Sequence, residues 1–436
     1  MRMRTYLSAM LVMALCTVSA MAADPSELTA MVEEGLAKNP ELHAGQARWD
    51  MLREKASQAG SLDDPMLMLK IQNGLIKDPL AFDKEAMTSK VIGISQQIPF
   101  AGKRALARKA ADQEAEAERW QFEERRIELT RMIKENYYRI YYVDQSLPIV
   151  ARNIQVLDDL IRFTETMYGV GKALQQDVLK AQVERSKMED MQIALRQQRR
   201  SLAAAFNSLL YRPAENDLPT VRNVTMAPLS ASIDELANVA QEKRPLIKGL
   251  AAQVEKGKTS QALAQKEYYP DFNVAFEYMQ RDPVMDEPGD DMYSLGVTFN
   301  LPINRQRRHA MVAEAMAETN MATQELNMLR NTIRQNIADS LARLERSRRM
   351  AELYQTAIIP QATGALDAAM AAYRVGKADF MNVLDSRMAL FNYERQYFEA
   401  VTEHQMVLAQ LEGVVGVTLP PVETPPSGDL NAGGGK

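Results

Sequence analysis

The longest pattern in this chain is helical. Residues 103–168 contain no glycine and one proline, Pro148, and residues 172–211 contain neither glycine nor proline. In the second of these segments apolar side chains recur every three or four residues, which is the spacing of a coiled coil. At about 1.5 Å per residue, the first segment would span roughly 100 Å as one helix. The pattern predicts a long antiparallel helical hairpin.

The second half of the chain repeats this arrangement. Residues 304–373 and 377–411 predict another long hairpin, interrupted by Pro360 and Gly364. Val-Gly-Lys stands at the turn of each hairpin, where glycine lets the chain reverse. A shorter helical segment precedes each hairpin, at residues 25–61 in the first half and 233–267 in the second.

Between the short helix and the hairpin, each half contains two segments with a period of two. Residues 271–280 and 291–301 alternate apolar side chains with polar or small ones, which predicts two strands. Their equivalents, residues 65–75 and 88–98, alternate less regularly. Strands of about ten residues with one apolar face suit a membrane barrel with a wet interior. They also suit a sheet packed on a soluble core, and the strands alone leave both interpretations open.

A duplication with a period of about 205 residues explains these repeats. Residues 167–179 align with residues 372–384 and are identical at 7 of 13 positions. The period is far longer than the roughly 20 to 50 residues of solenoid repeats. We therefore predict a signal peptide (1–22), a first repeat (23–211, tip 169–172), a linker (212–232), a second repeat (233–412, tip 374–377) and a disordered tail (413–436).

The first 22 residues predict export from the cytoplasm. Arg2 and Arg4 precede an apolar run that ends in a small-x-small cleavage site at residues 20–22. The single cysteine of the chain, Cys16, lies inside this segment, so the mature chain has no thiol for a disulfide or for catalysis. After residue 22 no run of 18 apolar residues occurs, so a membrane role would require β-strands.

Charge and motifs exclude several classes of function. The chain has 52 Lys and Arg against 57 Asp and Glu, so it lacks the basic excess that nucleic-acid binding needs. Gly102-Lys103 lacks the rest of a phosphate-binding loop, and neither His-Glu-x-x-His nor Gly-x-Ser-x-Gly occurs. We predict a protein that is not an enzyme, uses no cofactor and has no catalytic residues.

Potential metal ligands are scattered along the sequence. His43, His309 and His404 are far apart and have no ligand spacing, so we predict no fixed metal site. Of 27 methionines, 22 follow residue 22, and thioethers bind soft Cu(I). However, Met188 and Met191 form the only Met-x-x-Met pair of the mature chain, and methionine commonly fills gaps between helices. We therefore expect most methionines to pack in the core.

One chain offers too few strands for a membrane barrel. Four strands cannot close, because a closed barrel needs about eight or more. Open edges would leave unpaired backbone groups in lipid. Three copies would supply twelve strands, enough for a wet lumen, and twelve helical stretches that continue the barrel as a tube. A membrane role for the strands therefore predicts an oligomer.

With these features the sequence resembles the TolC family of outer-membrane efflux proteins, over essentially the whole mature chain. The resemblance rests on the duplicated unit, the twin Val-Gly-Lys tips and the strand-to-helix junction at residues 97–104. That junction, together with Asp64-Pro65, is most similar to the heavy-metal branch, the CzcC- and CusC-like channels. The implied fold is mixed but mainly α, with a trimeric twelve-stranded β-barrel continued by a twelve-helix α-barrel.

The resemblance also implies a location and partners. A homotrimer would sit in outer-membrane lipid of a Gram-negative bacterium and extend across the periplasm to a periplasmic adaptor, or membrane fusion protein, and an inner-membrane pump of RND type. It would be a passive exit duct for metal cations or other small toxic solutes. In the family the adaptor docks at the hairpin tips, which maps to Val170, Gly171, Lys172, Val375, Gly376 and Lys377.

The family's periplasmic gate maps to the same end of the hairpins. The gating tyrosine corresponds to Tyr373, and the acidic constriction to Asp385 and, in the first hairpin, Asp177. Two latch positions depart from the family pattern, since this chain has Ala378 and Asn382 where the family can have arginine and aspartate; Arg374 is the nearest alternative cation. The aspartates could instead stabilise helix N-termini. We favour the pore, where threefold symmetry would gather six carboxylates that pass cations.

Two other functions remain open at this point. A periplasmic coiled-coil adaptor or structural protein would explain the signal peptide and the long helices, but not the strand pairs found at the same place in both halves. A polypeptide-exporting channel of a type I secretion system would share the whole architecture. The sequence does not name the cargo, because the pump selects it.

Overall fold

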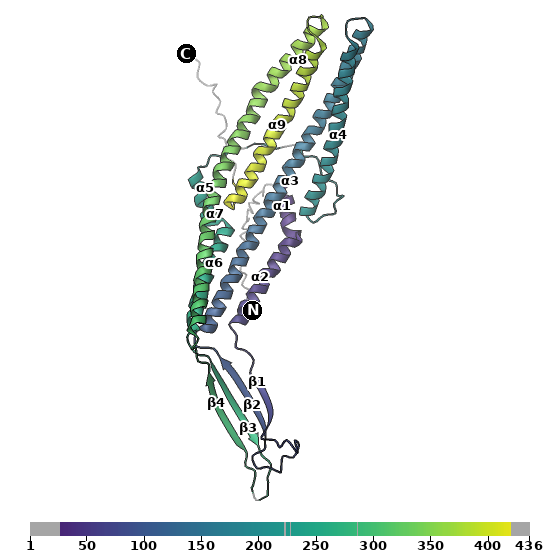
Figure 1. The fold of residues 1–436 in the computed structure, drawn as a ribbon. Coiled ribbons are helices and arrows are strands. Elements are labelled where there is room, and N and C mark those ends of the chain that lie inside the picture. Colours follow the sequence, from purple (N-terminus) through teal and green to yellow (C-terminus); the bar gives the residue numbers. More distant parts are fainter. Residues whose placement is uncertain (1–26, 222–223, 227, 286, 420–436) are drawn as a thin grey trace, which may run out of the picture.

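The computed structural model describes residues 27–221, 224–226, 228–285 and 287–419. The predicted signal peptide and the greater part of the predicted tail, residues 420–436, lie outside the described residues. The described chain is elongated, with a bundle of long helices that ends in a four-stranded sheet (Figure 1).

The same order of elements occurs in both halves. The first half consists of α1 (Glu27–Lys38), α2 (Pro40–Ala59), β1 (Met66–Gln72), β2 (Ser89–Ile98), α3 (Lys103–Gly169) and α4 (Gln175–Leu209). The second consists of α5 (Ile233–Lys243), α6 (Pro245–Lys266), β3 (Phe272–Gln280), β4 (Met292–Phe299), α7 (Arg305–Leu353), the π-helical turn η1 (Tyr354–Ile358), α8 (Ile359–Arg374) and α9 (Phe380–Val415). The predicted mainly helical, duplicated fold is confirmed.

The short helix of each half is broken in two, which corrects the prediction of continuous helices at residues 25–61 and 233–267. The breaks fall at Asn39 and Arg244, each with ψ near 120° and each followed by a proline. The ring of a proline disfavours helical geometry in the residue before it. Asn39 also caps α2, because its side chain accepts a hydrogen bond from the Glu41 backbone N–H at 2.9 Å.

The two hairpins differ in how they accommodate proline. Helix α3 runs through Pro148 without interruption, whereas the rod of the second half changes to the π-helical turn η1 shortly before Pro360. Gly364 lies inside α8 and does not interrupt the helix, contrary to the prediction. Helix α9 ends at Val415, where Gly416 takes the left-handed cap with φ of 86°, so the predicted tail begins as helix.

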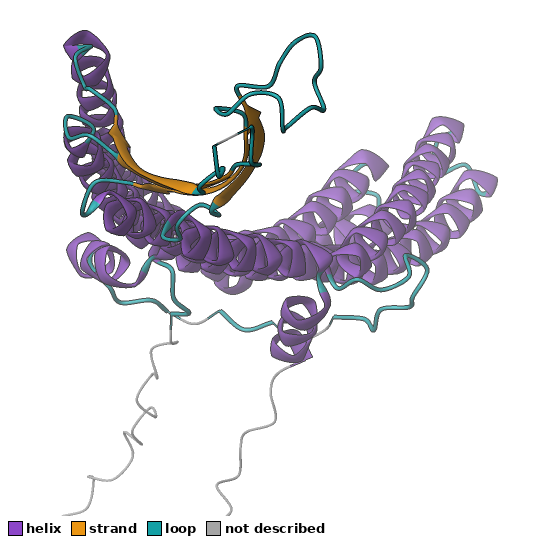
Figure 2. Ribbon diagram, turned by 90° about the horizontal axis from the view of Figure 1, so that it is seen from below, coloured by secondary structure: helices purple, strands orange, loops and turns teal. Residues whose placement is uncertain are grey.

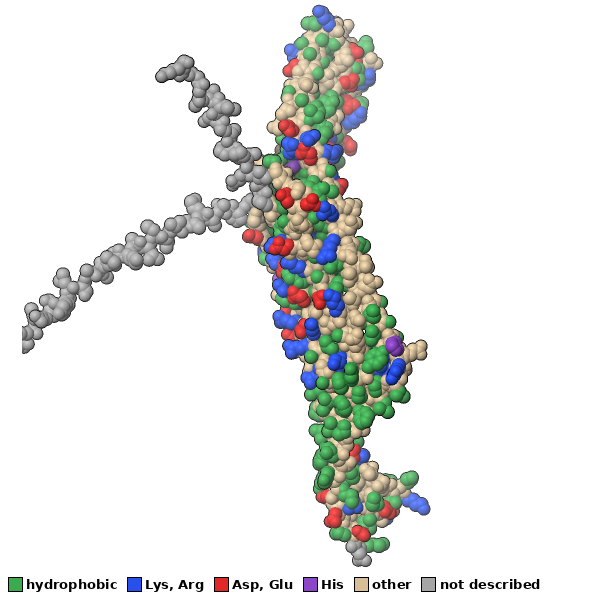
Figure 3. All heavy atoms as spheres, turned by 90° about the vertical axis from the view of Figure 1, so that its left-hand side faces the viewer, with side chains coloured by type: hydrophobic (Ala, Val, Ile, Leu, Met, Phe, Trp, Pro, Cys, Tyr) green, Lys and Arg blue, Asp and Glu red, His purple; other side chains and the backbone are tan. Residues whose placement is uncertain are grey.

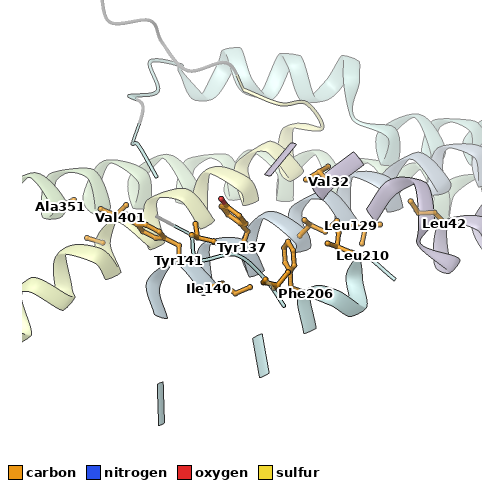
Figure 4. Packing of buried hydrophobic residues seen from close by; sticks show 14 residues of the cluster. Val32, Leu42, Leu129, Tyr137, Ile140, Tyr141, Phe206, Leu210, Ala351 and Val401 are labelled. Atoms are coloured by element: carbon orange, nitrogen blue, oxygen red, sulfur yellow. The ribbon is translucent and has the colours of Figure 1, made fainter. Parts of the chain in front are cut away.

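Helix α3 is the central element of the bundle. It packs against α4, α6, α2 and α9, and Figure 2 shows that the helices and the curved sheet each follow an arc. Buried aromatic and aliphatic side chains of α1, α3, the end of α4 and α9 form one core, with Tyr137 and Phe206 at its centre (Figure 4). Along the whole described chain, every helix is too short or too polar to cross a membrane.

Candidate functional site

The four strands form one antiparallel sheet in the order β1-β2-β3-β4. Strands β2 and β3 join the two halves of the duplication, with Ile94 opposite Phe276 and Gly93 opposite Glu277. Among the described residues, strands β1 and β4 each pair on one side only, so both edges of the sheet are open in this part of the chain. Such edges present unpaired N–H and C=O groups along a whole strand.

One face of the sheet is apolar over all four strands. Because directly opposed residues share a face, the register groups Leu67, Ile94, Phe276 and Leu295 into one row. The neighbouring rows of this face add further aliphatic and aromatic side chains, among them Tyr293, which stacks near Phe276. Most of these side chains are exposed, and Figure 3 shows hydrophobic atoms concentrated over the strands. A soluble domain would cover this area.

The opposite face is mixed in polarity. Lys70 on β1 reaches over β2 and binds Glu277 on β3 at 2.9 Å. This contact passes over Gly93, where an added Cβ would lie 3.1 Å from both Glu277 and Met68. The other residues on this face are Met66, Gln72, Ser89, Val91, Ser95, Gln97, Asn273, Ala275, Met279, Met292, Ser294, Gly296 and Thr298. The sheet is therefore apolar on one side and wettable on the other.

A buried lysine holds the sheet to the helical section. Lys103, the first residue of α3, places its ammonium 3.0 Å from Asp271 and 3.2 Å from Glu267. The backbone N–H of Phe100 donates to the same Asp271 carboxylate at 2.7 Å. The ring of Phe100 stacks on Tyr269 with centroids 4.6 Å apart. These contacts explain why the 97–104 motif stands at this junction: it ties the β2–α3 connection to the α6–β3 connection.

At the opposite end of the molecule, both hairpins turn through the same backbone motif. The N–H of Lys172 donates to the Met167 carbonyl at 2.8 Å, and that of Gly171 to Tyr168 at 2.9 Å. Lys377 and Gly376 repeat both bonds in the second hairpin, at 2.9 and 3.0 Å. This pattern is a Schellman motif, which needs a left-handed residue. Gly171 and Gly376 supply it, with φ of 72° and 71°.

The tips present apolar and basic side chains to solvent. Val170 and Val375 are 64% and 68% exposed, and Leu174 is similarly exposed. Lys172, Lys377 and Arg374 are exposed beside them. Apart from the residues adjoining each glycine, no described atom lies within 4 Å of the position that a Cβ would take on either tip glycine. Each tip thus presents an exposed apolar side chain that is flanked by basic residues.

The predicted acidic residues have different surroundings. Asp177 is nearly buried at the third position of α4, and its carboxylate accepts a hydrogen bond from the Leu174 N–H at 3.1 Å. In the second hairpin the cap is reversed, since Asp379 at the N-cap accepts from the Asn382 N–H at 3.0 Å. Asp385 is exposed on α9. Asp177 therefore caps the start of α4, whereas Asp385 is exposed and makes no capping hydrogen bond among the described residues.

The predicted gating tyrosine lies between the two hairpins. Tyr373 is 5% exposed and packs edge-on against Phe163 of α3 and Phe380 of α9. Burial raises the pKa of its hydroxyl; a contact with Thr164 opposes this shift, and the charge of nearby Asp177 adds to it. The structure thus brings Tyr373 and Asp177 together, while Asp385, Asn382 and Arg374 are exposed around them.

A buried polar contact between α3 and α9 was not anticipated. Arg387 of α9 donates from Nε to the Asn153 side chain of α3 at 2.6 Å, and both residues are buried. Burial lowers the pKa of Arg387. One guanidinium nitrogen finds no partner among the described residues. The signal in the sequence was a charged residue at a position of the helical repeat where an apolar one is expected.

The methionines divide into two groups. Met188 is buried in the hairpin core, as predicted. In contrast, Met66, Met68 and Met292 in the sheet are exposed, which corrects the expectation of core packing for them. Met51 and Met321 line a shared cavity of about 820 Å³, which is within the usual size of a ligand pocket. The three histidines lie on different helices, α2, α7 and α9.

Sequence comparison finds relatives over most of the chain. The family described as outer membrane efflux protein matches residues 31–210 and 236–417, which are the two halves of the duplication. The cobalt-zinc-cadmium resistance protein CzcC of Cupriavidus metallidurans is 21% identical over 399 residues, or 91% of each chain.

Solved structures share the fold at low sequence identity. The outer membrane protein VceC of Vibrio cholerae matches with a TM-score of 0.75 and 18% identity, covering 89% of this chain and 96% of that one. CusC, whose structures concern folding and transmembrane channel formation, matches with a TM-score of 0.76 and 15% identity, covering 89% and 92%.

Proposed function

Because the chain belongs to the outer membrane efflux protein family, it is an outer-membrane efflux channel and not an enzyme, and we propose that three copies close one conduit. Family membership also removes the coiled-coil adaptor from consideration. In this proposal each chain contributes one third of a β-barrel and one third of a helical tube. The conduit carries solutes passively across the periplasm and the outer membrane.

The main support for a trimer is the four-stranded sheet, which has two open edges and one apolar face. In lipid the unpaired edge of β4 needs a partner strand, and β1 of a second chain provides one. Repeating this contact three times pairs every edge and gives twelve strands. The apolar face with Leu67 and Phe276 then meets lipid, and the face with Lys70 and Glu277 meets water.

The tips are the proposed site for a periplasmic adaptor. Val170 and Val375 are exposed apolar side chains at the end farthest from the membrane, where a partner could bury them. The glycines beside them leave the backbone accessible. Through the adaptor the channel would connect to an inner-membrane pump, which we propose to be of RND type.

Metal cations are the proposed cargo. The relative CzcC is named for resistance to cobalt, zinc and cadmium, which supports this assignment. Asp385, exposed near the tip, would give the entrance a preference for cations, and three copies would place three such carboxylates around one axis. Tyr373 would hold the two hairpins together in the resting state.

Recording from the purified protein in planar bilayers tests this function. We expect unitary conductance steps with a preference for cations, and a weaker preference in Asp385→Asn. Ser386→Ala is the matched control, since it changes a neighbouring side chain without removing charge. A protein that inserts into the bilayer but never conducts would contradict the proposal.

A further inference from the structure

Four methionines lie on the wettable face of the sheet in each chain. Met66 and Met68 are on β1, Met279 is on β3 and Met292 is on β4. The register assigns them to this face. Met66 is opposite Ser95 and Met68 is opposite Gly93. Met279 lies between Val91 on one side and Met292 on the other, in a row of the same face. Apolar side chains on the water side of a membrane sheet need an explanation other than lipid contact.

Two of these methionines are a directly opposed pair. Met279 pairs with Met292 across β3 and β4, which places their Cβ atoms about 4.5 to 5.5 Å apart on the same face. Met292 is exposed and Met279 is partly exposed, so neither residue is buried in the core of the protein. Two flexible thioethers at this separation can share one metal ion.

The charges beside the pair are compatible with a bound cation. Glu277 precedes Met279 by two residues on the same face, and Lys70, which lies in the same row as the pair, is already bonded to Glu277 at 2.9 Å. Arg281 follows Met279 by two residues and donates from Nε to the Asp290 carbonyl at 2.7 Å, and Asp291 directly precedes Met292. The methyl group of Met68 lies over Gly93 next to the same Glu277 side chain. The surroundings are therefore close to neutral and contain a third thioether.

We propose that Met279 and Met292 form a binding site for soft monovalent cations, Cu(I) or Ag(I), in the lumen of the channel. This rests on the proposed function, since the wettable face becomes a lumen only in the closed assembly. Thioethers are soft ligands that select Cu(I), whereas zinc in proteins takes Cys, His, Asp or Glu. A site of two thioethers would hold the ion weakly, as passage through a conduit requires.

Silver binding to the full-length protein in detergent, in a chloride-free buffer, tests the site. Equilibrium dialysis followed by elemental analysis gives the Ag(I) bound per chain. The double variant Met279→Leu and Met292→Leu preserves volume and hydrophobicity, so the fold is retained. It should bind about one Ag(I) fewer per chain than the wild type, while Zn(II) uptake stays the same.

Met285→Leu is the matched control. Met285 is completely exposed in the β3–β4 loop, outside the register of the sheet, so it presents an unpaired thioether. This variant should bind Ag(I) as the wild type does. Equal Ag(I) binding by the double variant and the wild type, or an equal loss in Met285→Leu, would overturn the proposal.

Bilayer recordings separate failure of the site from failure of the channel. Ag(I) should shorten the open events of the wild type and leave the double variant unaffected. If the wild type does not conduct at all, the channel assignment fails, while the dialysis result still decides whether the thioether pair binds silver. Conduction that is equally sensitive to Ag(I) in both proteins would contradict the site alone.

Discussion

The two helical hairpins share one turn but are held in different ways. Gly171 and Gly376 have almost the same φ and close the same pair of hydrogen bonds. The tyrosines three residues earlier, in contrast, differ completely: Tyr168 is 49% exposed, whereas Tyr373 is 5% exposed and packs between the hairpins. Duplication has retained what the backbone requires and changed what side-chain packing decides.

The helix that follows each turn shows the same division. In the first hairpin, Asp177 is the third residue of α4, and its carboxylate accepts a hydrogen bond from the N–H of Leu174, the residue just before the helix. In the second hairpin, Asp379 is the N-cap residue of α9, and its carboxylate accepts a hydrogen bond from the N–H of Asn382 inside the helix. Each hairpin thus carries one half of a capping box, and either half satisfies an otherwise unpaired N–H group.

The largest effect should come from the tips. Gly171→Leu or Gly376→Leu places a side chain in the left-handed region, which costs about 1 to 2 kcal/mol locally, and it also blocks the exposed tip. We expect metal tolerance of cells to be lost while outer-membrane trimers remain. Gly364→Ala is the control, because this glycine is helical and has open space around it. Loss of the trimers would instead mean that the glycines are only structural.

The second-largest effect should be the difference in stability and resting conductance between variants of the two equivalent tyrosines, Tyr373 and Tyr168. Tyr373→Ala empties a buried site and should cost about 3 kcal/mol, whereas Tyr168→Ala at an exposed site should stay within about 0.5 kcal/mol. Thermal unfolding in detergent measures this difference in stability between the two variants. Bilayer recording should show a raised resting conductance in Tyr373→Ala alone. Equal behaviour of the two variants would refute the asymmetry of the hairpins.

The reciprocal caps should give equal, smaller effects. Asp177→Ala and Asp379→Ala each remove one capping hydrogen bond and should cost about 1 kcal/mol. Asp385→Ala, at an exposed position with no capping bond, should leave the unfolding midpoint unchanged. If Asp177→Ala were as harmless to stability as Asp385→Ala, and lowered cation preference as much, Asp177 would belong to the constriction rather than to the cap.

The smallest effect concerns pH and occurs in the first half only. Hydrogen bonds from Arg212, with a further one from Lys38, lower the pKa of Glu34 from 4.5 to about 2. Because the folded pKa is the lower one, this stabilisation is present above pH 4.5 and is lost as the pH falls from 4.5 towards 2. The residues equivalent to Glu34 and Arg212 are Val239 and Val417, which do not titrate.

Replacing the carboxylate tests that difference. Glu34→Gln should lower the free energy of unfolding by about 0.5 kcal/mol at pH 7, and the deficit should disappear near pH 2. Glu33→Gln, one residue away at an exposed position, serves as the control. A deficit that persists unchanged at pH 2 would show that the carboxylate acts through packing.

Much of this architecture could be predicted because it depends on local pattern. Missing glycines and prolines mark the long helices, and the period of two marks the strands. The tip glycines follow from a chain reversal that L-residues resist. The breaks at Asn39 and Arg244 were also foreseeable from the prolines that follow, although the helical periodicity obscured them.

The parts that escaped prediction depend on contacts distant in sequence. Nothing local distinguishes Tyr373 from Tyr168, because the burial of Tyr373 comes from α3 and α9 together. The Arg387 contact with Asn153 joins residues 234 positions apart. The methionine pair could not be recognised until the strand register was known, since facing positions depend on pairing and not on spacing.

The central claim is that β4 of one chain pairs with β1 of the next in a ring of three. Residues 23–436 contain no cysteine, so Leu69→Cys on β1 and Leu295→Cys on β4 would be the only thiols of this part of the chain. Within one chain these strands are separated by β2 and β3, roughly 14 Å at about 4.8 Å per strand, beyond the reach of a short thiol crosslinker. The account predicts covalent species that end at three chains in the double variant and no crosslinking in either single variant. Monomers alone, or a ladder that continues beyond three chains, would contradict it.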